Sequence, residues 1–163
     1  MKHRKLDLYL LVGAAIFLIA SLTAAGVTGY LAWQERQSES ARTDSVVVAR
    51  RAVDGMFGYS YQSVDLQMAK VTDDMTPEFK ADWDKVVSEN ISKSAKEKEL
   101  VVTANIQATG VLSASSDKAD VMVFLNQKSV GKDPATGTYI QSRLKVSLEK
   151  QGSRWLVSDV NPI

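Results

Sequence analysis

The chain of 163 residues has no cysteine, a single histidine and three prolines. Without cysteine it forms neither a disulfide framework nor a cysteine-ligated zinc site. The one histidine, His3, lies beside the N-terminus, which leaves almost no material for a Ser-His-Asp triad, a two-histidine metal site or a histidine general base. The formal net charge of +1 also lacks the strong positive excess of nucleic-acid-binding domains, so we expect no nucleic-acid partner.

Charge is also missing from one long stretch of the chain, between Asp7 and Glu35. As a helix, residues 8–34 would be about 40 Å long, enough to cross a hydrocarbon core of about 30 Å. The side chains of residues 1–7 carry a net charge of +2, whereas acidic and basic residues are mixed after the window. The positive-inside rule therefore predicts a cytoplasmic basic tail at 1–7, a transmembrane helix at 8–34 and an extracytoplasmic remainder, in a single-pass inner-membrane protein.

A cleaved signal peptide is the alternative interpretation of this window, because Ala24-Ala25-Gly26 offers small residues of the right kind. The apolar stretch continues to Trp33, however, beyond the usual ~7–15 residues of a signal-peptide core, which favours an uncleaved anchor. Within the span, Ser21, Ala25 and Gly29 recur at every fourth position. Such a stripe of small residues predicts a face for close contact with another helix, although small residues are common in membrane helices generally.

After the window, residues 35–45 are predicted to form a polar, solvated stalk, and residues 46–163 the extracytoplasmic domain. Helical spacing then indicates three helices. The first is expected to have its N-cap at Thr43, Asp44 or Ser45 and to end at Gly58; Thr76 is the expected N-cap of the third. Their apolar stripes are Val46, Ala49, Val53 and Met56/Phe57; Val64, Met68, Val71 and Met75; and Phe79, Trp83, Val86/Val87 and Ile91.

The apolar period changes from 3.6 to 2 after Glu99, which predicts about four antiparallel strands. Their segments are 100–112, 119–127, 138–150 and 154–160. The inward-facing sets are predicted to be Val102, Ala104, Ile106 and Ala108 on the first strand, and Ile140, Leu144, Val146 and Leu148 on the third. Helices followed by a meander of strands indicate the α+β class, with the helices packed on a curved sheet. Phe79 and Trp155 are predicted to join the third helix to the last strand in the core.

No motif for phosphate, dinucleotide, zinc or calcium binding occurs in the sequence. The acidic pairs Asp73-Asp74 and Asp82/Asp84 suit turn and helix-dipole chemistry better than a metal site, which needs several convergent oxygens. We therefore expect no metal and no cofactor. The basic residues Arg143, Lys145, Lys128 and Lys132 either contact anionic lipid headgroups or form the wet face of a half-buried sheet.

One enzymatic hypothesis places a desolvated carboxylate and a tyrosine in a cavity between sheet and helices. The candidates are Tyr59, Tyr61, Asp54, Asp65, Asp120 and Asp159, and Asp159 shares strand parity with Trp155 and Val157. The competing interpretation, that the tyrosines pack and the acids pair at element ends, is favoured because no matched pair of catalytic groups stands out. The sequence therefore predicts a protein that is not an enzyme.

The order of parts resembles the actinobacterial Mce-associated membrane protein family. The residues that carry the resemblance are Tyr61, Asp65, Phe79, Asn126-Gln127, the run Arg154-Trp155-Leu156-Val157, and Pro162. The resemblance implies one membrane helix followed by an NTF2-like (SnoaL-like) cone of helices on a curved antiparallel sheet. It also implies a non-catalytic accessory subunit of an Mce-type lipid import system, with Mce and permease subunits as partners and no catalytic residues to carry over.

Two alternatives remain open at this point. VirB8-like components of type IV secretion systems resemble the chain in the same layout, with one membrane helix and an NTF2-like periplasmic domain, and would make it a scaffold. A membrane-tethered NTF2-like enzyme would instead need a buried Asp–Tyr pair. We also expect that the domain can form a homo-oligomer.

Overall fold

The computed structural model describes residues 23, 26, 38–133 and 137–163. The chain divides into two compact units, 1–37 and 38–163, and the second is described here by itself. The expected membrane helix at 8–34 lies outside the described residues, apart from residues 23 and 26. Among the described residues, no helix is both long enough and apolar enough to span a membrane.

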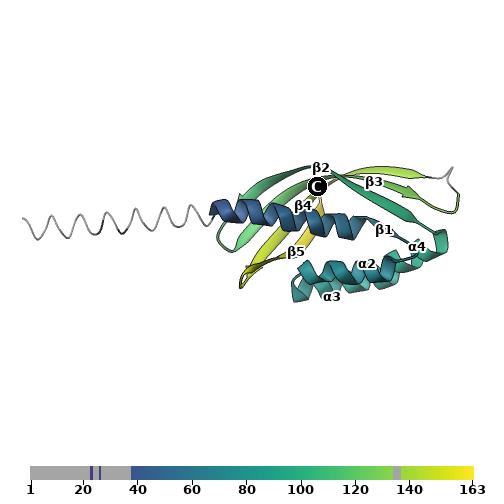
Figure 1. The fold of residues 1–163 in the computed structure, drawn as a ribbon, viewed down its shortest axis with the longest axis horizontal. Helices are drawn as coiled ribbons and strands as arrows, with labels where there is room; N and C mark the ends of the chain where they lie inside the picture. Colours follow the sequence, from purple (N-terminus) through teal and green to yellow (C-terminus); the bar gives the residue numbers. More distant parts are fainter. Residues whose placement is uncertain (1–22, 24–25, 27–37, 134–136) are drawn as a thin grey trace, which may run out of the picture. The chain divides into compact units, whose positions relative to one another are not determined.

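The second unit is built on one antiparallel sheet in which every strand pairs with its neighbour in sequence (Figure 1). Its α+β class and its curved meander agree with the sequence analysis. There are five strands rather than about four, because the two-residue strand β1 is too short to show a period of two. The strands are β1 Tyr59–Ser60, β2 Val101–Ala114, β3 Lys118–Val130, β4 Thr138–Gln151 and β5 Arg154–Pro162.

A long helix, called the first helix here, covers residues 38–57 and runs alongside the sheet (Figure 1). It ends at Gly58 as predicted, where the Gly58 N–H donates to the Asp54 carbonyl at 2.9 Å. The predicted N-cap at 43–45 is wrong, because the helix already includes residue 38. Ala41 and Ser45 are buried, so the segment expected to be a solvated stalk packs on the domain within its described part.

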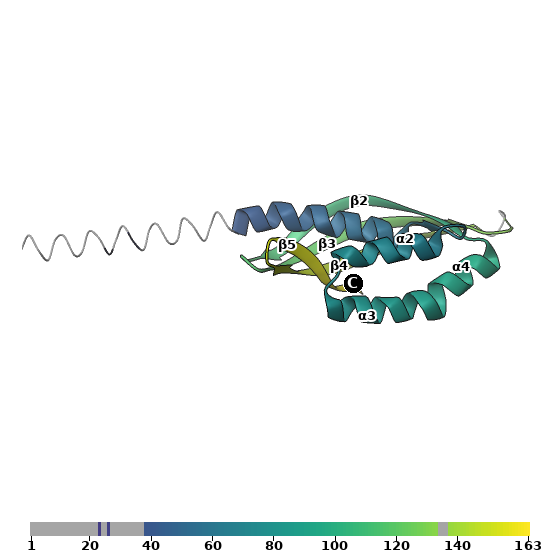
Figure 2. The ribbon, with the colours of Figure 1, turned by 60° about the horizontal axis from the view of Figure 1, so that its bottom comes forward.

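The remaining helical segments form a second layer (Figure 2). They are α2 Val64–Val71, the short turn η1 Thr72–Asp74, α3 Pro77–Val86, the π-helical turn η2 Val87–Ile91 and α4 Ser92–Lys98. Thr76 caps α3 as predicted, since its Oγ1 accepts from the Phe79 N–H at 3.3 Å. Met75 was expected on the second helix. It is instead extended and forms an isolated parallel bridge with Val157, which ties this layer to β5.

The π-helical turn follows from the spacing of apolar residues. The inward stripe is Phe79, Trp83, Val87, Ile91 and Ala95, each four residues after the last. Four residues of an α-helix turn through about 400°, so this stripe would drift by about 40° at each step. A wider π turn takes up the extra residue and keeps the stripe on one face. Val86, an alternative member of the predicted stripe, is consequently turned outward and is 43% exposed.

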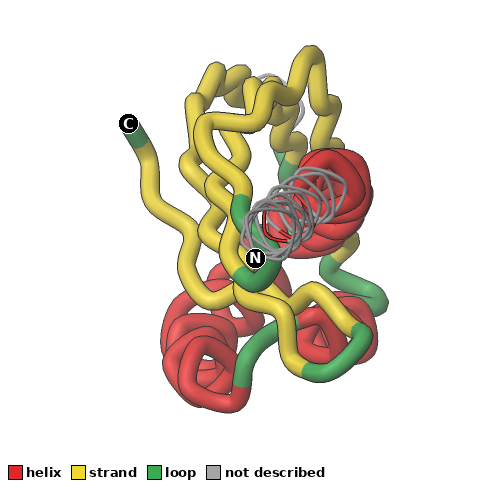
Figure 3. The backbone as a smooth tube through the Cα atoms, turned by 90° about the vertical axis from the view of Figure 1, so that its left-hand side faces the viewer, coloured by secondary structure: helices red, strands yellow, loops and turns green. Residues whose placement is uncertain are grey.

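All the helices of this unit gather on one side of the sheet (Figure 3). The main core cluster joins the first helix to the inner face of β3, β4 and β5, and includes Val53, Val123, Val146, Trp155 and Val157. A second cluster fills the space between the helices. Trp155 is buried, and Phe79 packs against both clusters, as the sequence predicted for this pair.

Two residues of the predicted inner face lie elsewhere. A β-bulge between Ile106 and Ala108 inserts an extra residue in β2, so Ala108 pairs with Phe124 on the outer face and is exposed. Ile140 keeps its register opposite Gln127 but is 50% exposed. The alternation of apolar and polar residues along one strand shows neither a bulge nor the point at which the helices stop covering the sheet.

Candidate functional site

The candidate catalytic residues do not meet in one cavity. Tyr59 and Tyr61 are half-buried and pack against the cluster between the helices. Burial raises the pKa of Tyr59, so its phenol stays neutral. Tyr61 accepts a hydrogen bond from Gln62 at 3.3 Å. Asp54, by contrast, is exposed on the first helix.

The other three carboxylates lie on different surfaces. Asp65 is exposed on α2, where a hydrogen bond from Lys96 at 2.5 Å, with a smaller contribution from Ser92, lowers its pKa. Asp120 lies on the outer face of the sheet and accepts from Ser147 at 2.7 Å and Ser113 at 3.3 Å.

The inward orientation expected for Asp159 is wrong. A register shift in the β4–β5 ladder, between the pairs Ser147–Asp159 and Leu148–Val157, breaks its parity with Trp155 and Val157. Asp159 therefore pairs opposite Ser147 and accepts a hydrogen bond from Asn161.

One member of each acidic pair, Asp74 and Asp82, forms ion pairs. Asp74 binds Arg51 through two hydrogen bonds, at 2.6 and 3.0 Å, and lies 3.7 Å from Arg154. The bond to Asp74 raises the pKa of Arg51. The Asp73 carbonyl accepts from Arg154, and Asp82 pairs with Lys85 at 3.2 Å. Within the described part of the chain, no three acidic, histidine or cysteine side chains gather as a metal site would require.

The basic residues do not form one continuous patch. Arg143 and Lys145 alternate with the buried residues Leu144 and Val146 on β4, so they belong to the outer face of the sheet. Lys128 lies near the far end of β3, and Lys132, in the loop that follows, pairs with Glu99 at 3.3 Å. The predicted helix-contact residues Ser21, Ala25 and Gly29 fall outside the described residues, and this stripe stays a prediction.

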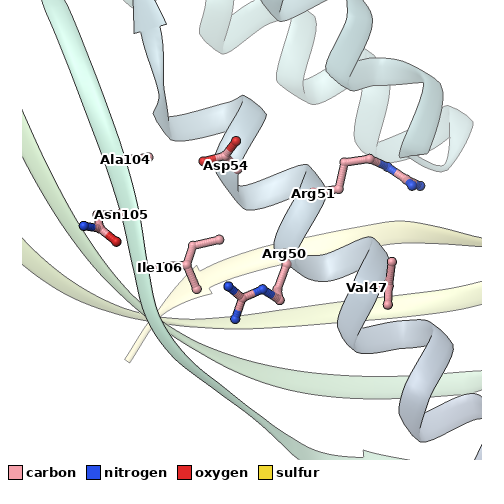
Figure 4. Close-up of a pocket in the computed structure, with 7 residues that line it drawn as sticks. All are labelled: Val47, Arg50, Arg51, Asp54, Ala104, Asn105 and Ile106. Atoms are coloured by element: carbon pink, nitrogen blue, oxygen red, sulfur yellow. The ribbon is translucent and has the colours of Figure 1, made fainter.

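The most distinctive surface is a groove between the first helix and the edge of β2 (Figure 4). It encloses about 530 Å³ and is lined by Val47, Arg50, Arg51 and Asp54 from the helix and by Ala104, Asn105 and Ile106 from the strand. Arg50 and Ile106 extend into the space between the two elements, whereas Asn105 and Arg51 point away from it (Figure 4). The groove therefore combines apolar side chains with a cation, Arg50, and a carboxylate, Asp54, at its rim.

The edge of β2 beside this groove is open. β1 pairs only with Val101 and Val102, and beyond them no other described strand continues the ladder on that side. Tyr61 donates to the Leu100 carbonyl at 2.8 Å, which fixes Leu100 and Val102 as residues whose backbone groups face β1. By alternation, and allowing for the bulge, the backbone groups of Ile106, Thr109 and Val111 face outward from the sheet edge.

The groove was missed at the sequence level, although one indication was present. The 17 residues from Leu100 to Ser116 contain no charge and no proline. Edge strands usually carry such residues as protection against pairing with another chain. Locating β2 at an edge needed the sheet order, which the sequence does not provide.

Several solved structures of bacterial proteins share the fold of the second unit. The periplasmic domain of DotI superposes with a TM-score of 0.63 at 16% identity, covering 74% of this chain and 94% of that one. A periplasmic fragment of TraM gives 0.61 at 11% identity, with coverage of 74% and 95%. CagV, a VirB8 homologue of the Helicobacter pylori type IV secretion system, gives 0.58 at 16% identity, with coverage of 74% and 95%. The fold of the second unit is therefore VirB8-like, within the broader NTF2-like architecture.

This finding corrects the function expected from the sequence. The expected role as an accessory subunit of an Mce-type lipid import system is wrong, because the similar solved structures include CagV, a VirB8 homologue of a type IV secretion system, and an IcmL-like type IV secretion system protein from Legionella pneumophila. The alternative VirB8-like interpretation agrees better with them.

Sequence relatives come from Mycobacterium tuberculosis. Outer membrane protein Rv1973 is 29% identical over 139 residues, covering 83% of this chain and 86% of that protein. Uncharacterized protein Rv1362c is 26% identical over 154 residues, with coverage of 91% and 70%. The family model described as "Uncharacterized protein Rv1363c/MT1408-like" matches residues 9–163. The chain thus belongs to the Rv1363c/MT1408-like family.

Proposed function

We propose that this chain is a non-enzymatic scaffold subunit of an envelope-spanning, type IV secretion-like assembly. The observation that carries the proposal is the VirB8-like fold of residues 38–163, which accounts for nearly the whole length of the DotI and TraM domains. The TM-scores of 0.61 and 0.63 support a shared architecture, at sequence identities of 11% and 16%.

The placement of the polar groups supports a role without turnover. The six candidate catalytic residues are spread over the groove, α2, the helix cluster and the outer sheet face. A general acid–base site needs two groups within reach of one substrate. Changing Asp65, Asp120 or Asp159 to asparagine, one at a time, is therefore expected to leave transport unchanged wherever the protein accumulates normally. Loss of transport with normal abundance and normal complex formation would contradict this.

The same proposal places the chain in the inner membrane, as a single-pass protein with a cytoplasmic N-terminus and an extracytoplasmic domain that forms homo-oligomers. Support comes from the uncharged window at 8–34 and the basic residues before it. The periplasmic location given for the DotI and TraM domains and the name of the relative Rv1973 fit an envelope protein.

The test is recovery of the tagged full chain from its own cells in mild detergent, followed by mass spectrometry. We expect a secretion ATPase and channel subunits in stoichiometric amounts. If transport components of the envelope are absent from repeated preparations that retain the intact chain, the proposal is refuted.

A pair of membrane-span variants then locates the contact. Ala25→Leu with Gly29→Leu adds bulk to the predicted small-residue face and keeps the span apolar, so insertion should persist while partner recovery falls. The matched control is Thr23→Leu with Val27→Leu on the opposite side. Equal recovery from both double variants would show that the span is only an anchor and that the folded unit holds the partner.

A further inference from the structure

We propose that the open edge of β2 is a docking site for an extended peptide segment of a partner protein, which adds as an antiparallel strand beside the first helix. The segment would carry apolar side chains followed, two residues later, by an acidic one. Its residues are different from those of the predicted membrane-span contact, so the inference goes beyond the proposed function.

The two edges of the sheet differ in how they are protected. The outer edge of β5 is covered at Val157, because the Val157 carbonyl accepts a hydrogen bond from the Thr76 N–H at 2.9 Å. β5 also has an irregular register at Ser158, and its last residue is Pro162. These features block pairing with another chain. The edge of β2 has two bulges but neither charge nor proline over its 14 residues. A strand left in this state suits the addition of a further strand.

The chain itself covers only the first part of the β2 edge. β1 pairs with Val101 and Val102, and Gly58 then lies so close to Ala104 that an added Cβ would approach the Ala104 Cβ at 3.3 Å. The end of the first helix therefore occupies the position beside Ala104 where an added strand would lie. Farther along the same edge of β2, no described segment pairs with Ile106, Thr109 or Val111.

An added strand would meet side chains of the first helix. Val47 is 56% exposed and lies one helical turn before Arg50. No salt bridge joins Arg50 to any residue of the described chain, whereas Arg51 is held by Asp74. A carboxylate placed opposite Ile106 would face Arg50 (Figure 4). Thr109 and Val111 follow Ile106 on β2 as Val47 precedes Arg50 on the antiparallel first helix, so apolar side chains opposite them would lie toward Val47. Asp54, the carboxylate on the same rim, lies a further turn away, toward the position that Gly58 occupies.

The orientation of the segment follows from the direction of the elements. The first helix leads into β1, which is antiparallel to β2, so a strand antiparallel to β2 runs in the same direction as the helix. From its N-terminus to its C-terminus, the added strand therefore passes Val47 first and Arg50 second. The apolar residues must therefore precede the acidic residue.

Charge also distinguishes a partner segment from a second copy of this chain. Pairing two β2 edges about a two-fold axis near Ile106 would bring the Arg50 side chains of both copies toward each other. Like charges in such proximity oppose association. An acidic peptide instead neutralises the single cation.

The experiment uses the purified full chain in dodecyl maltoside and a fluorescein-labelled peptide, Thr-Val-Thr-Val-Thr-Glu-Thr. Fluorescence anisotropy gives its dissociation constant. The matched control peptide, Thr-Glu-Thr-Val-Thr-Val-Thr, has the same composition in reverse order and should bind at least about fivefold more weakly, roughly the effect of one lost ion pair of about 1 kcal/mol. Equal binding of the two peptides overturns the predicted orientation, and no binding of either overturns the site.

A charge exchange tests the role of Arg50. Arg50→Glu is expected to weaken binding of the glutamate peptide and to favour Thr-Val-Thr-Val-Thr-Lys-Thr over it. Arg50 is exposed, so circular dichroism should show an unchanged fold. The control variant Arg42→Glu lies earlier on the same helix, outside the groove lining, and should leave both affinities unchanged. If Arg50→Glu does not alter the preference, the assigned contact is wrong.

Hydrogen exchange identifies the mode of binding. The peptide should slow exchange in the segment that contains Ile106, Thr109 and Val111 and leave β3, which is bonded on both sides, unchanged. Protection elsewhere overturns the site. Protection of the same edge in the absence of peptide, together with a dimeric mass in solution, would show that a second copy is the occupant and would also overturn the proposal.

Discussion

Replacing Trp155 by alanine removes the largest side chain that β5 contributes to the core. Trp155 is 5% exposed and packs in the cluster that joins the first helix to the sheet. Truncation of a buried tryptophan typically costs about 3–5 kcal/mol, because the site loses transfer energy and retains a cavity. The whole free energy of unfolding of a domain is about 5–15 kcal/mol.

The size of the folded unit converts this cost into a temperature. Residues 38–163 make up 126 residues. At about 2.1 cal/mol/K per residue the entropy of unfolding is about 0.26 kcal/mol/K, so a loss of 4 kcal/mol lowers the melting temperature by about 15 °C. Thermal unfolding followed by circular dichroism should show a decrease of about 10–20 °C for Trp155→Ala.

A conservative variant separates packing from polar effects. The Nε1 atom of Trp155 is buried with no hydrogen-bond partner among the described residues. Trp155→Phe removes this unpaired donor and keeps a large aromatic ring, so it should lower the melting temperature much less than Trp155→Ala. Leu66→Ala, at a side chain 63% exposed on α2, is the surface control and should change it by no more than about 2 °C. If Trp155→Ala melts within about 3 °C of the parent, the assigned core is wrong.

Three further predictions concern single interactions. Thr76→Val keeps the side-chain volume but removes the α3 cap, and should cost about 1 kcal/mol in chemical denaturation. Lys96 lowers the pKa of Asp65, so this ion pair stabilises the fold fully above the usual carboxyl pKa of about 3.9, and the stabilisation is lost as the pH falls through the lowered value. Asp65→Asn should therefore lose less stability than the parent as the pH is lowered below about 4. Glu99 has a φ of 52°, in the left-handed region that glycine adopts with less strain. Glu99→Gly should therefore raise the free energy of unfolding by up to about 1 kcal/mol, although it removes the exposed ion pair with Lys132. An unchanged or lower free energy of unfolding would contradict this.

The sequence predicted those parts of the fold that depend on local pattern. The cap at Thr76, the helix end at Gly58 and the alternating strands each follow from a few neighbouring residues. The bulge after Ile106 could not be predicted, because an extra residue in one strand is defined only by its partner strand. The same limit applies to Asp159, whose orientation reverses at an irregularity beside Ser158.

The candidate groove could not be predicted from local sequence pattern, for a related reason. Arg50 and Ile106 are 56 positions apart in the chain and meet only because the first helix lies along the edge of β2. A helical stripe shows which side chains face the core. It does not show which strand ends the sheet, so the open edge was found only from the pairing order.

The neighbour-to-neighbour order of the strands has a consequence for how the protein matures. Each hairpin from β2 to β5 can form soon after its own residues are made, because its pairing is local in sequence. Of the described elements the first helix leaves the ribosome earliest, yet the core cluster that holds its apolar face includes Val146, Trp155 and Val157, close to the end of the chain. During synthesis that face therefore cannot complete its burial until the last strand is made. We expect nascent chains that lack β5 to be highly sensitive to proteases and to bind chaperones along the first helix.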